Sequence, residues 1–249
     1  MKKTALITGA SSGFGEAIAR NLANQGYKLI LLARRKECLK KLAQELKTNT
    51  HLIIGDIRDK NFIFQEIKNL PQNFADIEIL VNNAGLALGQ DKTQDAQIDD
   101  FETMIDTNIK GLIYITKAVL PIMIKNKNGY IFNLGSVAGI YPYPGGNVYG
   151  GTKAFVKQFS NNLRNDLIGT NIRVTTIAPG LCKTEFSEVR FKGDKQKADK
   201  VYENTLFTTA DDIAQIVSDC LKMHPRTNIN YIELMATTQT WAGFAFERF

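Results

Sequence analysis

The feature that most constrains the fold of this chain is the regular alternation of short apolar runs with segments of helical period. Most of the apolar runs are nearly continuous in Val, Ile, Leu and Ala rather than alternating with polar residues. Strands of this kind occur where helices cover both faces of a parallel sheet. The predicted strands span residues 4–8, 28–33, 51–55, 77–82, 129–134, 172–178 and 230–234. The pattern therefore predicts an α/β fold with one doubly wound parallel sheet of about seven strands.

The segments between the predicted strands have the period of amphipathic helices. One of them has an apolar residue at every fourth position, at Phe155, Phe159, Leu163 and Leu167, which predicts an apolar stripe. No Pro/Gly-rich linker, composition shift or internal repeat divides the 249 residues, so residues 1–249 are predicted to form a single domain.

Residues 181–209 break this rhythm before a helix that is predicted to begin near Ala210. The segment is rich in Lys, Asp and Glu and has only scattered apolar positions. A connection of this length inside a compact domain is usually functional. We therefore predict a helical lid over a binding site, with an insertion of no function as the alternative.

The composition limits the classes of protein to which the chain can belong. It is 44% hydrophobic and 22% charged, which is ordinary for a globular protein. The net charge of +6 suits a nucleic acid, an anionic membrane, an acidic small ligand or simply a lysine-rich surface. The densest basic stretch, residues 192–200, is interrupted by Asp194 and Asp199 and has no aromatic residue, so we expect no nucleic-acid partner.

Membrane and metal sites are not expected either. No stretch reaches the roughly 18 apolar residues of a membrane span, so a cytoplasmic protein is predicted. Three cysteines, Cys38, Cys182 and Cys220, form no close pair, and the chain has only two histidines. Disulfide frameworks and zinc sites need tighter spacing, so neither is predicted.

A glycine-rich turn joins the first predicted strand to the first predicted helix. Glycines allow a sharp turn and a close approach of the backbone to a pyrophosphate, and the helix N-terminus behind them presents free N–H groups. A purely structural turn is the alternative, but the place between a strand and a helix favours dinucleotide binding. The candidate cofactor-binding residues here are Gly9, Ser11, Ser12, Gly13, Phe14 and Gly15.

The end of the second predicted strand distinguishes the two nicotinamide dinucleotides. An acidic residue there would bind the ribose 2′-OH of NAD, but this chain has Arg34 and Arg35, and no carboxylate before Glu37. A guanidinium binds a 2′-phosphate through two hydrogen bonds. We therefore predict NADP, with two solvated surface arginines as the alternative.

Tyr149 and Lys153 are spaced four residues apart, so both project from one face of a helix. A free tyrosine has a pKa of about 10, and an adjacent ammonium is expected to lower that pKa toward neutrality. Tyr149 could then give a proton to a carbonyl oxygen while a nicotinamide supplies hydride. Ser136, after the fifth predicted strand, is placed to hydrogen-bond the same oxygen. Such pairs also arise by chance in helices, so the pair alone is weak support.

Together these features resemble the short-chain dehydrogenase/reductase family over nearly the whole chain. The resemblance depends on the order of the glycine-rich turn, Asp56-Ile57, Asn82-Asn83-Ala84-Gly85, Asn108, Ser136, Tyr149-x-x-x-Lys153 and Pro179-Gly180. It implies a Rossmann-like fold and a catalytic set of Asn108, Ser136, Tyr149 and Lys153. In this set Lys153 also holds the nicotinamide ribose, and Asn108 supports a water relay behind the lysine.

The same resemblance implies further contacts to the cofactor. Asp56 would contact the adenine, and Thr184 would touch the nicotinamide carboxamide. The other residues implied along the cofactor are Ile57, Asn82, Ala84, Gly85, Tyr149, Lys153, Pro179 and Gly180. Gly151, where alanine is more usual, and Cys182-Lys183 before Thr184 depart from the pattern. Neither departure removes a functional group.

The lid segment from Thr184 to Asp194 and the segment from Asn228 to Gly243 resemble one branch of the family. Its members are 3-hydroxy acid dehydrogenases, also described as serine or L-allo-threonine dehydrogenases and malonic semialdehyde reductases. The resemblance implies a substrate such as serine, L-allo-threonine, 3-hydroxypropionate or 3-hydroxyisobutyrate. A carboxylate near Tyr149 would need a cation, and Arg190 is the candidate, with Ser136, Tyr149 and Phe186 as the other substrate residues.

Two alternatives remain for the function. One is another reductase on the same scaffold, such as a 3-ketoacyl carrier-protein reductase, and the other is a non-catalytic NADP-binding sensor. The resemblance also implies a homotetramer or homodimer. The apolar C-terminal residues Trp241, Phe244, Phe246 and Phe249 could pack on their own subunit or across a neighbour.

Overall fold

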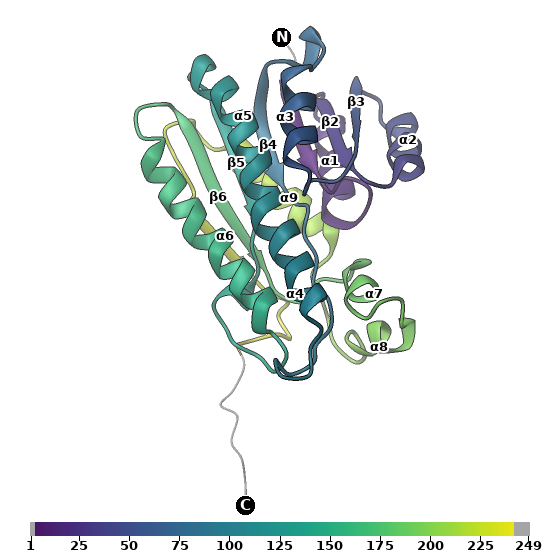
Figure 1. Ribbon diagram of the computed structural model, residues 1–249. Helices are drawn as coiled ribbons and strands as arrows, with labels where there is room; N and C mark the ends of the chain where they lie inside the picture. The colour runs from purple at the N-terminus through teal and green to yellow at the C-terminus, as the bar shows by residue number, and fades with distance from the viewer. Residues whose placement is uncertain (1–2, 242–249) are drawn as a thin grey trace, which may run out of the picture.

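The computed structural model describes residues 3–241, in which seven strands form one parallel sheet with the order β3-β2-β1-β4-β5-β6-β7 (Figure 1). The strands are β1 (Thr4–Thr8), β2 (Lys28–Ala33), β3 (Thr50–Ile54), β4 (Ile77–Asn82), β5 (Gly129–Leu134), β6 (Ile172–Pro179) and β7 (Tyr231–Leu234). Every pair of neighbouring strands is parallel. The predicted doubly wound sheet is confirmed. The bounds of β6 and β7 differ from the predicted ones by one residue at one end, and β3 is shifted by one residue at both ends.

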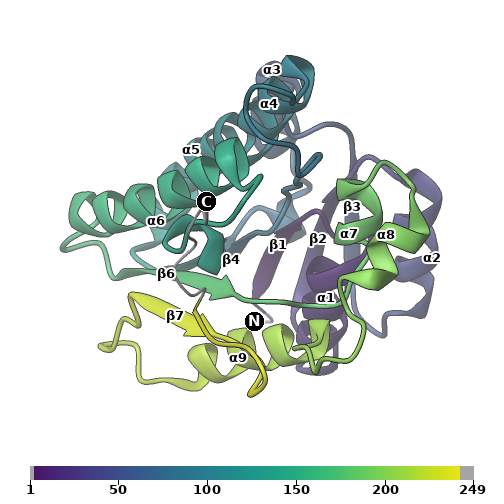
Figure 2. The ribbon, with the colours of Figure 1, turned by 90° about the horizontal axis from the view of Figure 1, so that it is seen from below.

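Helices cover both faces of the sheet, which explains the nearly continuous apolar strands. Ala5 and Ile7 of β1 pack with the helices of one layer, whereas Leu6 between them packs with the other layer. The first layer comprises α1 (Gly13–Asn24), α2 (Lys36–Glu45) and α9 (Ala210–Lys222). The second comprises α3 (Lys60–Lys68), α4 (Ile98–Ile105), α5 (Leu112–Asn126) and α6 (Asn147–Asp166), as Figure 2 shows from below. Three short helical turns, η1 (Gln72–Phe74), η2 (Asp106–Gly111) and η3 (Val137–Gly139), lie between α3 and β4, between α4 and α5, and between β5 and α6.

The apolar stripe predicted on α6 is only partly present. Leu163 and Leu167 are buried, but Phe155 and Phe159 are half-buried and stack on each other with ring centroids 5.7 Å apart. The buried face of α6 instead includes polar side chains, among them Ser160, whose hydroxyl donates to the Val156 carbonyl. Hydrogen bonding within the core lets α6 turn this polar face inward.

The helix that runs from α4 through η2 into α5 is the most apolar in the structure. Within residues 3–241 it is the one helix, Ile98–Asn126, that is long and apolar enough to cross a membrane by length and composition. It is nevertheless no run of about 18 apolar residues, because polar and charged residues such as Lys110, Thr116 and Lys117 interrupt it. Ile115, Val119 and Met123 pack in the core beneath the sheet, which accounts for much of the apolar composition.

The crevice of the fold lies at the carboxyl ends of the strands. β1 and β4 are neighbours, and the chain leaves them toward opposite edges of the sheet, which creates the opening where α/β sheets bind ligands. Two short helices, α7 (Phe186–Arg190) and α8 (Lys195–Lys200), follow β6 at this end (Figures 1 and 2). They belong to residues 181–209, the segment that we predict to be a lid.

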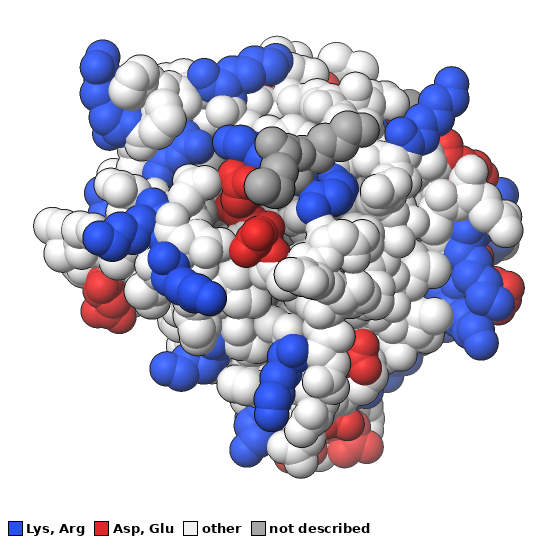
Figure 3. Space-filling view, turned by 90° about the horizontal axis from the view of Figure 1, so that it is seen from above, with Lys and Arg blue, Asp and Glu red and all other residues white. Residues whose placement is uncertain are grey.

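At the opposite end of the molecule, the Lys and Arg side chains among residues 3–241 form no continuous basic surface. Figure 3 shows this face, where Lys and Arg side chains lie scattered around the rim with Asp and Glu among them. This view of the face fits a solvated lysine-rich surface better than a groove for a polyanion.

Candidate active site

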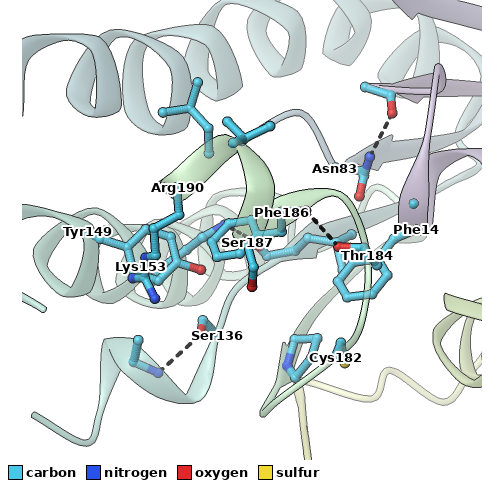
Figure 4. A pocket seen from close by; sticks show the side chains of 18 of the residues that line it. Phe14, Asn83, Ser136, Tyr149, Lys153, Cys182, Thr184, Phe186, Ser187 and Arg190 are labelled. Carbon is cyan, nitrogen blue, oxygen red and sulfur yellow. Dashed lines mark hydrogen bonds between the residues drawn. The ribbon is translucent and has the colours of Figure 1, made fainter. Parts of the chain in front are cut away.

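A cavity of 730 Å³ lies between the carboxyl ends of the strands and the lid. It unites most of the side chains that the sequence analysis selected from distant segments. Those that line it are Gly9, Ser11, Ser12, Gly13, Phe14, Arg34, Arg35, Asp56, Ile57, Ala84, Gly85, Ser136, Tyr149, Lys153, Pro179, Gly180, Thr184, Phe186 and Arg190. Figure 4 shows Arg190, Phe186, Tyr149 and Lys153 close together.

Gly15 and Asn82 lie behind the cavity wall rather than in it. A Cβ atom on Gly15 would come within 2.4 Å of the Gly9 carbonyl oxygen, so this glycine permits the fold of the turn. The Asn82 amide is buried and donates to Thr116 and Asn133. Asn83 lines the cavity in its place, because side chains of successive residues leave a strand on opposite faces.

The glycine-rich turn is fixed by that asparagine. Gly9 and Gly13 have φ of +64° and +54°, a region that disfavours side chains. The Asn83 amide donates to the carbonyl oxygens of Thr8 at 2.9 Å and Gly9 at 3.2 Å. The turn is therefore held open in front of the α1 N-terminus, where free N–H groups suit an anion.

The two predicted arginines lie at the adjoining corner of the cavity. Arg35 donates to the hydroxyl of Ser11 at 3.1 Å and to that of Ser12, and it pairs with Glu185 of the lid segment at 2.8 Å. Arg34 is more exposed, with its guanidinium 4.0 Å from Asp56. Burial alone would raise the pKa of Asp56, but hydrogen bonds from Arg58 and the charge of Arg34 hold it below its usual value. Two guanidiniums beside a glycine-rich turn fit a dinucleotide that bears an additional phosphate.

Tyr149 and Lys153 project from the same face of α6 and are both almost completely buried. The Lys153 Nζ atom donates to the Leu134 carbonyl oxygen at 2.8 Å and lies 5.8 Å from the centroid of the Tyr149 ring. Burial lowers the pKa of Lys153 to about 8. Burial raises the pKa of Tyr149 to about 12, although a hydrogen bond from Ser136 and the charge of Arg190 oppose that rise.

The sequence alone predicts that Lys153 lowers the pKa of Tyr149 toward neutrality, and this prediction is wrong, because burial raises that pKa instead. The ammonium is directed at a backbone carbonyl rather than at the phenol, and desolvation of the phenolate outweighs the nearby charges. With a pKa of about 12, Tyr149 is protonated at neutral pH. This state suits a proton donor.

Asn108 lies behind this pair, in the π-helical turn η2. Its amide oxygen accepts from the Leu86 N–H at 2.9 Å, and its Nδ2 donates to the Leu86 carbonyl and to the Thr152 hydroxyl. Asn108 thus clamps the loop after β4 to the helix that carries Tyr149. A Cβ atom on Gly85 would lie 3.1 Å from the Asn108 oxygen and 3.5 Å from Lys153 Nζ, which shows how closely the three residues pack.

Arg190 enters the cavity from the C-terminal end of α7. Its guanidinium carbon lies 5.2 Å from the Tyr149 ring centroid, 5.5 Å from that of Phe186 and 5.6 Å from that of Tyr143. One Nη atom donates to the Tyr143 hydroxyl. The buried Nε–H has no hydrogen-bond partner among the residues that the structure describes. A cation among aromatic rings with an unused donor is suited to bind an anion.

Among the cavity residues that the sequence analysis did not select as site residues are three polar ones that make contacts at the site: Asn83, Tyr143 and Glu185. Asn83 belongs to the Asn82-Asn83-Ala84-Gly85 motif of the sequence analysis. Because successive side chains of a strand point to opposite faces, this alternation could have indicated that Asn83 and Asn82 do not both face the cavity. Tyr143 and Glu185 carried no such signal, because their partners lie 47 and 150 residues away. No group of three or more His, Cys, Asp or Glu side chains within residues 3–241 is placed to hold a metal ion.

Comparison with known proteins shows the family to which this chain belongs. The short chain dehydrogenase family model matches residues 3–195, and the chain belongs to this family of oxidoreductases. A curated relative, an NADP-dependent 3-hydroxy acid dehydrogenase of Escherichia coli strain K12, is 51% identical, with 98% of each chain covered.

A second relative and a solved structure are also similar to this chain over nearly its whole length. A sulfoacetaldehyde reductase of Chromohalobacter salexigens is 48% identical, with both chains covered completely. A solved structure of the closed form of a serine dehydrogenase with NADP⁺ superposes with a TM-score of 0.97 at 50% identity, covering 98% of this chain and 99% of that one.

Proposed function

We propose that this enzyme interconverts a 3-hydroxy acid and the corresponding 3-oxo acid or semialdehyde with NADP as the oxidant or NADPH as the reductant. The observation that carries the proposal is Arg190, a half-buried guanidinium with an unused donor beside the Tyr149 ring. The names of the relatives support the same class of reaction, since they include a 3-hydroxy acid dehydrogenase and a serine dehydrogenase.

The cofactor fits the glycine-rich turn and the arginine corner. Gly9 to Gly13 and the α1 N-terminus would hold the pyrophosphate, and Arg34 and Arg35 would hold the 2′-phosphate. Asp56, Ile57, Ala84, Gly85, Pro179, Gly180 and Thr184 line the remaining length of the cavity. When bound, the nicotinamide supplies or accepts the hydride.

Tyr149 is the proton donor to the carbonyl oxygen in the reductive direction. Its burial keeps the phenol protonated, and the Ser136 hydroxyl is near enough to orient the same oxygen. Lys153 retains its charge below pH of about 8, so it can stabilise the phenolate that remains after proton transfer. In the oxidative direction Tyr149 takes the proton back. Asn108 fixes the loop and helix that bear this group, and the water relay is part of the same proposal.

Arg190 and Tyr143 form the anion-binding part of the substrate site. The free Nε–H of Arg190 can donate to an oxyanion, and the Tyr143 hydroxyl accepts from Arg190 and so keeps its own proton for the same purpose. Phe186, with its ring centroid 5.6 Å from that of Tyr149, covers the apolar carbons. A sulfonate in place of the carboxylate, as the name of one relative indicates, would use the same donors.

The proposal is tested by steady-state kinetics with serine, L-allo-threonine, 3-hydroxypropionate, 3-hydroxyisobutyrate and sulfoacetaldehyde, beside the methyl ester of 3-hydroxypropionate. We expect kcat/KM for at least one acid to exceed that for the neutral ester by about 10²-fold, because the ester leaves the half-buried Arg190 guanidinium without an anion. Rapid reduction of neutral ketones together with no turnover of any acid would overturn it. Turnover only of carrier-protein-bound substrates would favour a ketoacyl reductase.

The arginine corner gives a separate prediction for the cofactor. Replacing Arg35 by Gln should raise KM for NADP by about tenfold and leave KM for NAD nearly unchanged, because only NADP carries the 2′-phosphate. Lys36→Gln, at an exposed neighbour that does not line the cavity, is the matched control. Equal effects of Arg35→Gln on both cofactors would show that Arg35 does not bind the 2′-phosphate, and no effect on either would show that it is only a surface residue.

We also propose a cytoplasmic homotetramer or homodimer. In residues 3–241, Cys38, Cys182 and Cys220 are free, as expected in a reducing compartment. Ile98 and Ile124 of the apolar helix are exposed, which favours contact with another subunit. Of the C-terminal aromatic residues, Trp241 lines the cavity and donates to Glu233, whereas Phe244, Phe246 and Phe249 lie outside the described residues.

A further inference from the structure

The lid helix that carries Arg190 is fastened to the body of the protein by an ion pair at its C-terminal end. Lys192 Nζ lies 2.8 Å from the Asp100 carboxylate. The Asp100 side chain is only 16% exposed, whereas that of Lys192 is 57% exposed. A carboxylate so deeply placed needs a compensating partner, and the structure gives it a lysine from the lid.

Asp100 lies on α4, which packs against α6, the helix that carries Tyr149. Asp100 is in the first turn of α4, where the helix dipole favours a negative charge. One turn further on, Met104 is buried in the same apolar cluster as Tyr149 and Leu86. This packing places the Asp100 carboxylate at a defined position relative to Tyr149, where it can hold a segment that approaches the cavity from outside.

The ion pair lies next to a second attachment in the lid backbone. The Gly89 N–H donates to the Arg190 carbonyl oxygen at 2.9 Å. Lys192 lies two residues after the end of α7 and has φ of +52°, a left-handed conformation that is unusual for a residue with a side chain. From this turn its ammonium reaches Asp100. Arg190 is thus held to the body through its own carbonyl and through the residue two positions later.

We propose that Asp100 is a positioning residue for substrate binding: through Lys192 it holds α7 in the place from which Arg190 reaches the substrate anion. The inference rests on the proposed function, because it gives Arg190 the anion. Asp100 does not line the cavity, so its effect must be transmitted through the lid. At the N-terminal end of α7, Glu185 forms an ion pair with Arg35, so this end is attached to the proposed cofactor site instead.

The test compares Asp100→Asn, Lys192→Met and the double variant. Each single change should raise KM for the anionic substrate by about three- to tenfold, which is typical of losing one partly buried ion pair. We expect kcat, KM for NADP and KM for the neutral methyl ester to change less than twofold. The double variant should be no worse than either single variant, because the two residues act as one unit. Asp219→Asn, which breaks an exposed ion pair with Lys222 on α9, is the matched control.

The outcomes separate this inference from the proposed function. Unchanged KM in Asp100→Asn, with a large rise in Arg190→Leu, would overturn the positioning role and leave the anion site intact. Additive effects of the two single changes would also overturn it. A loss of thermal stability with equal loss of kcat for acid and ester would show a merely structural role. Unchanged KM for the acid in Arg190→Leu itself would remove the function on which the inference depends.

Discussion

Replacing Tyr149 by Phe is expected to lower kcat in the reductive direction by roughly 10²- to 10⁴-fold, the range that general acid–base groups contribute. The change removes one buried hydroxyl and keeps the ring that packs against Phe186 and lies beneath Arg190. Binding of NADP, followed by quenching of protein fluorescence, should be nearly unaffected. The expected result is an intact protein that binds both ligands and hardly turns over.

Tyr114→Phe is the matched control, since Tyr114 is a half-buried tyrosine on α5 that does not line the cavity. It should keep kcat within about twofold, as surface-type changes usually do. If Tyr149→Phe kept full activity, the phenol would not be the proton donor. No turnover by the unaltered protein would instead favour an NADP-binding sensor without catalysis.

The second large effect is expected at Arg190. Arg190→Leu should raise KM for the acid substrate by about 10²-fold, because an oxyanion in a buried site would lose its charge-assisted hydrogen bonds. Arg190→Lys should recover only part of this loss, since an ammonium keeps the charge but lacks the planar fork. The measurement is the ratio of kcat/KM for the acid to that for its methyl ester, which should fall in both variants.

The ester serves as the internal control for this prediction, since it lacks the charge that Arg190 would bind. A second control is Lys200→Leu, an exposed cation at the end of α8 in the same lid. Equal loss for acid and ester in Arg190→Leu would indicate that the side chain acts by packing on the rings of Tyr143, Tyr149 and Phe186 rather than by its charge.

The seven strands and their order of appearance followed from the sequence because burial on both faces leaves a local pattern. Side chains such as Ala5 and Leu6 go to opposite layers, and both must be apolar. The glycine-rich turn and the common face of Tyr149 and Lys153 were readable for the same reason: strand ends, turn residues and helical spacing are properties of a few consecutive residues. The family and its cofactor followed from these local features in order.

Residue spacing along the chain gave wrong predictions where the burial or pKa of a side chain depends on its tertiary surroundings. Phe155 and Phe159 have the period of a buried stripe, yet both are only half-buried. The face of α6 that is buried carries Ser160, Thr152 and Lys153, whose side chains find hydrogen-bond partners in the core. The pKa of Tyr149 also depends on burial, and burial raised it where the neighbouring lysine alone predicted a decrease.

What the sequence by itself determined is therefore the scaffold: the parallel sheet, the turn beside α1 and the helix that presents Tyr149 above Lys153. What only the tertiary structure decided is which distant side chains meet at that scaffold. Arg190 meets Tyr143, Arg35 meets Glu185, and Lys192 meets Asp100 through the folding of the lid onto the body. These pairs come together by packing between remote segments, and no periodicity within one segment encodes its contact with another.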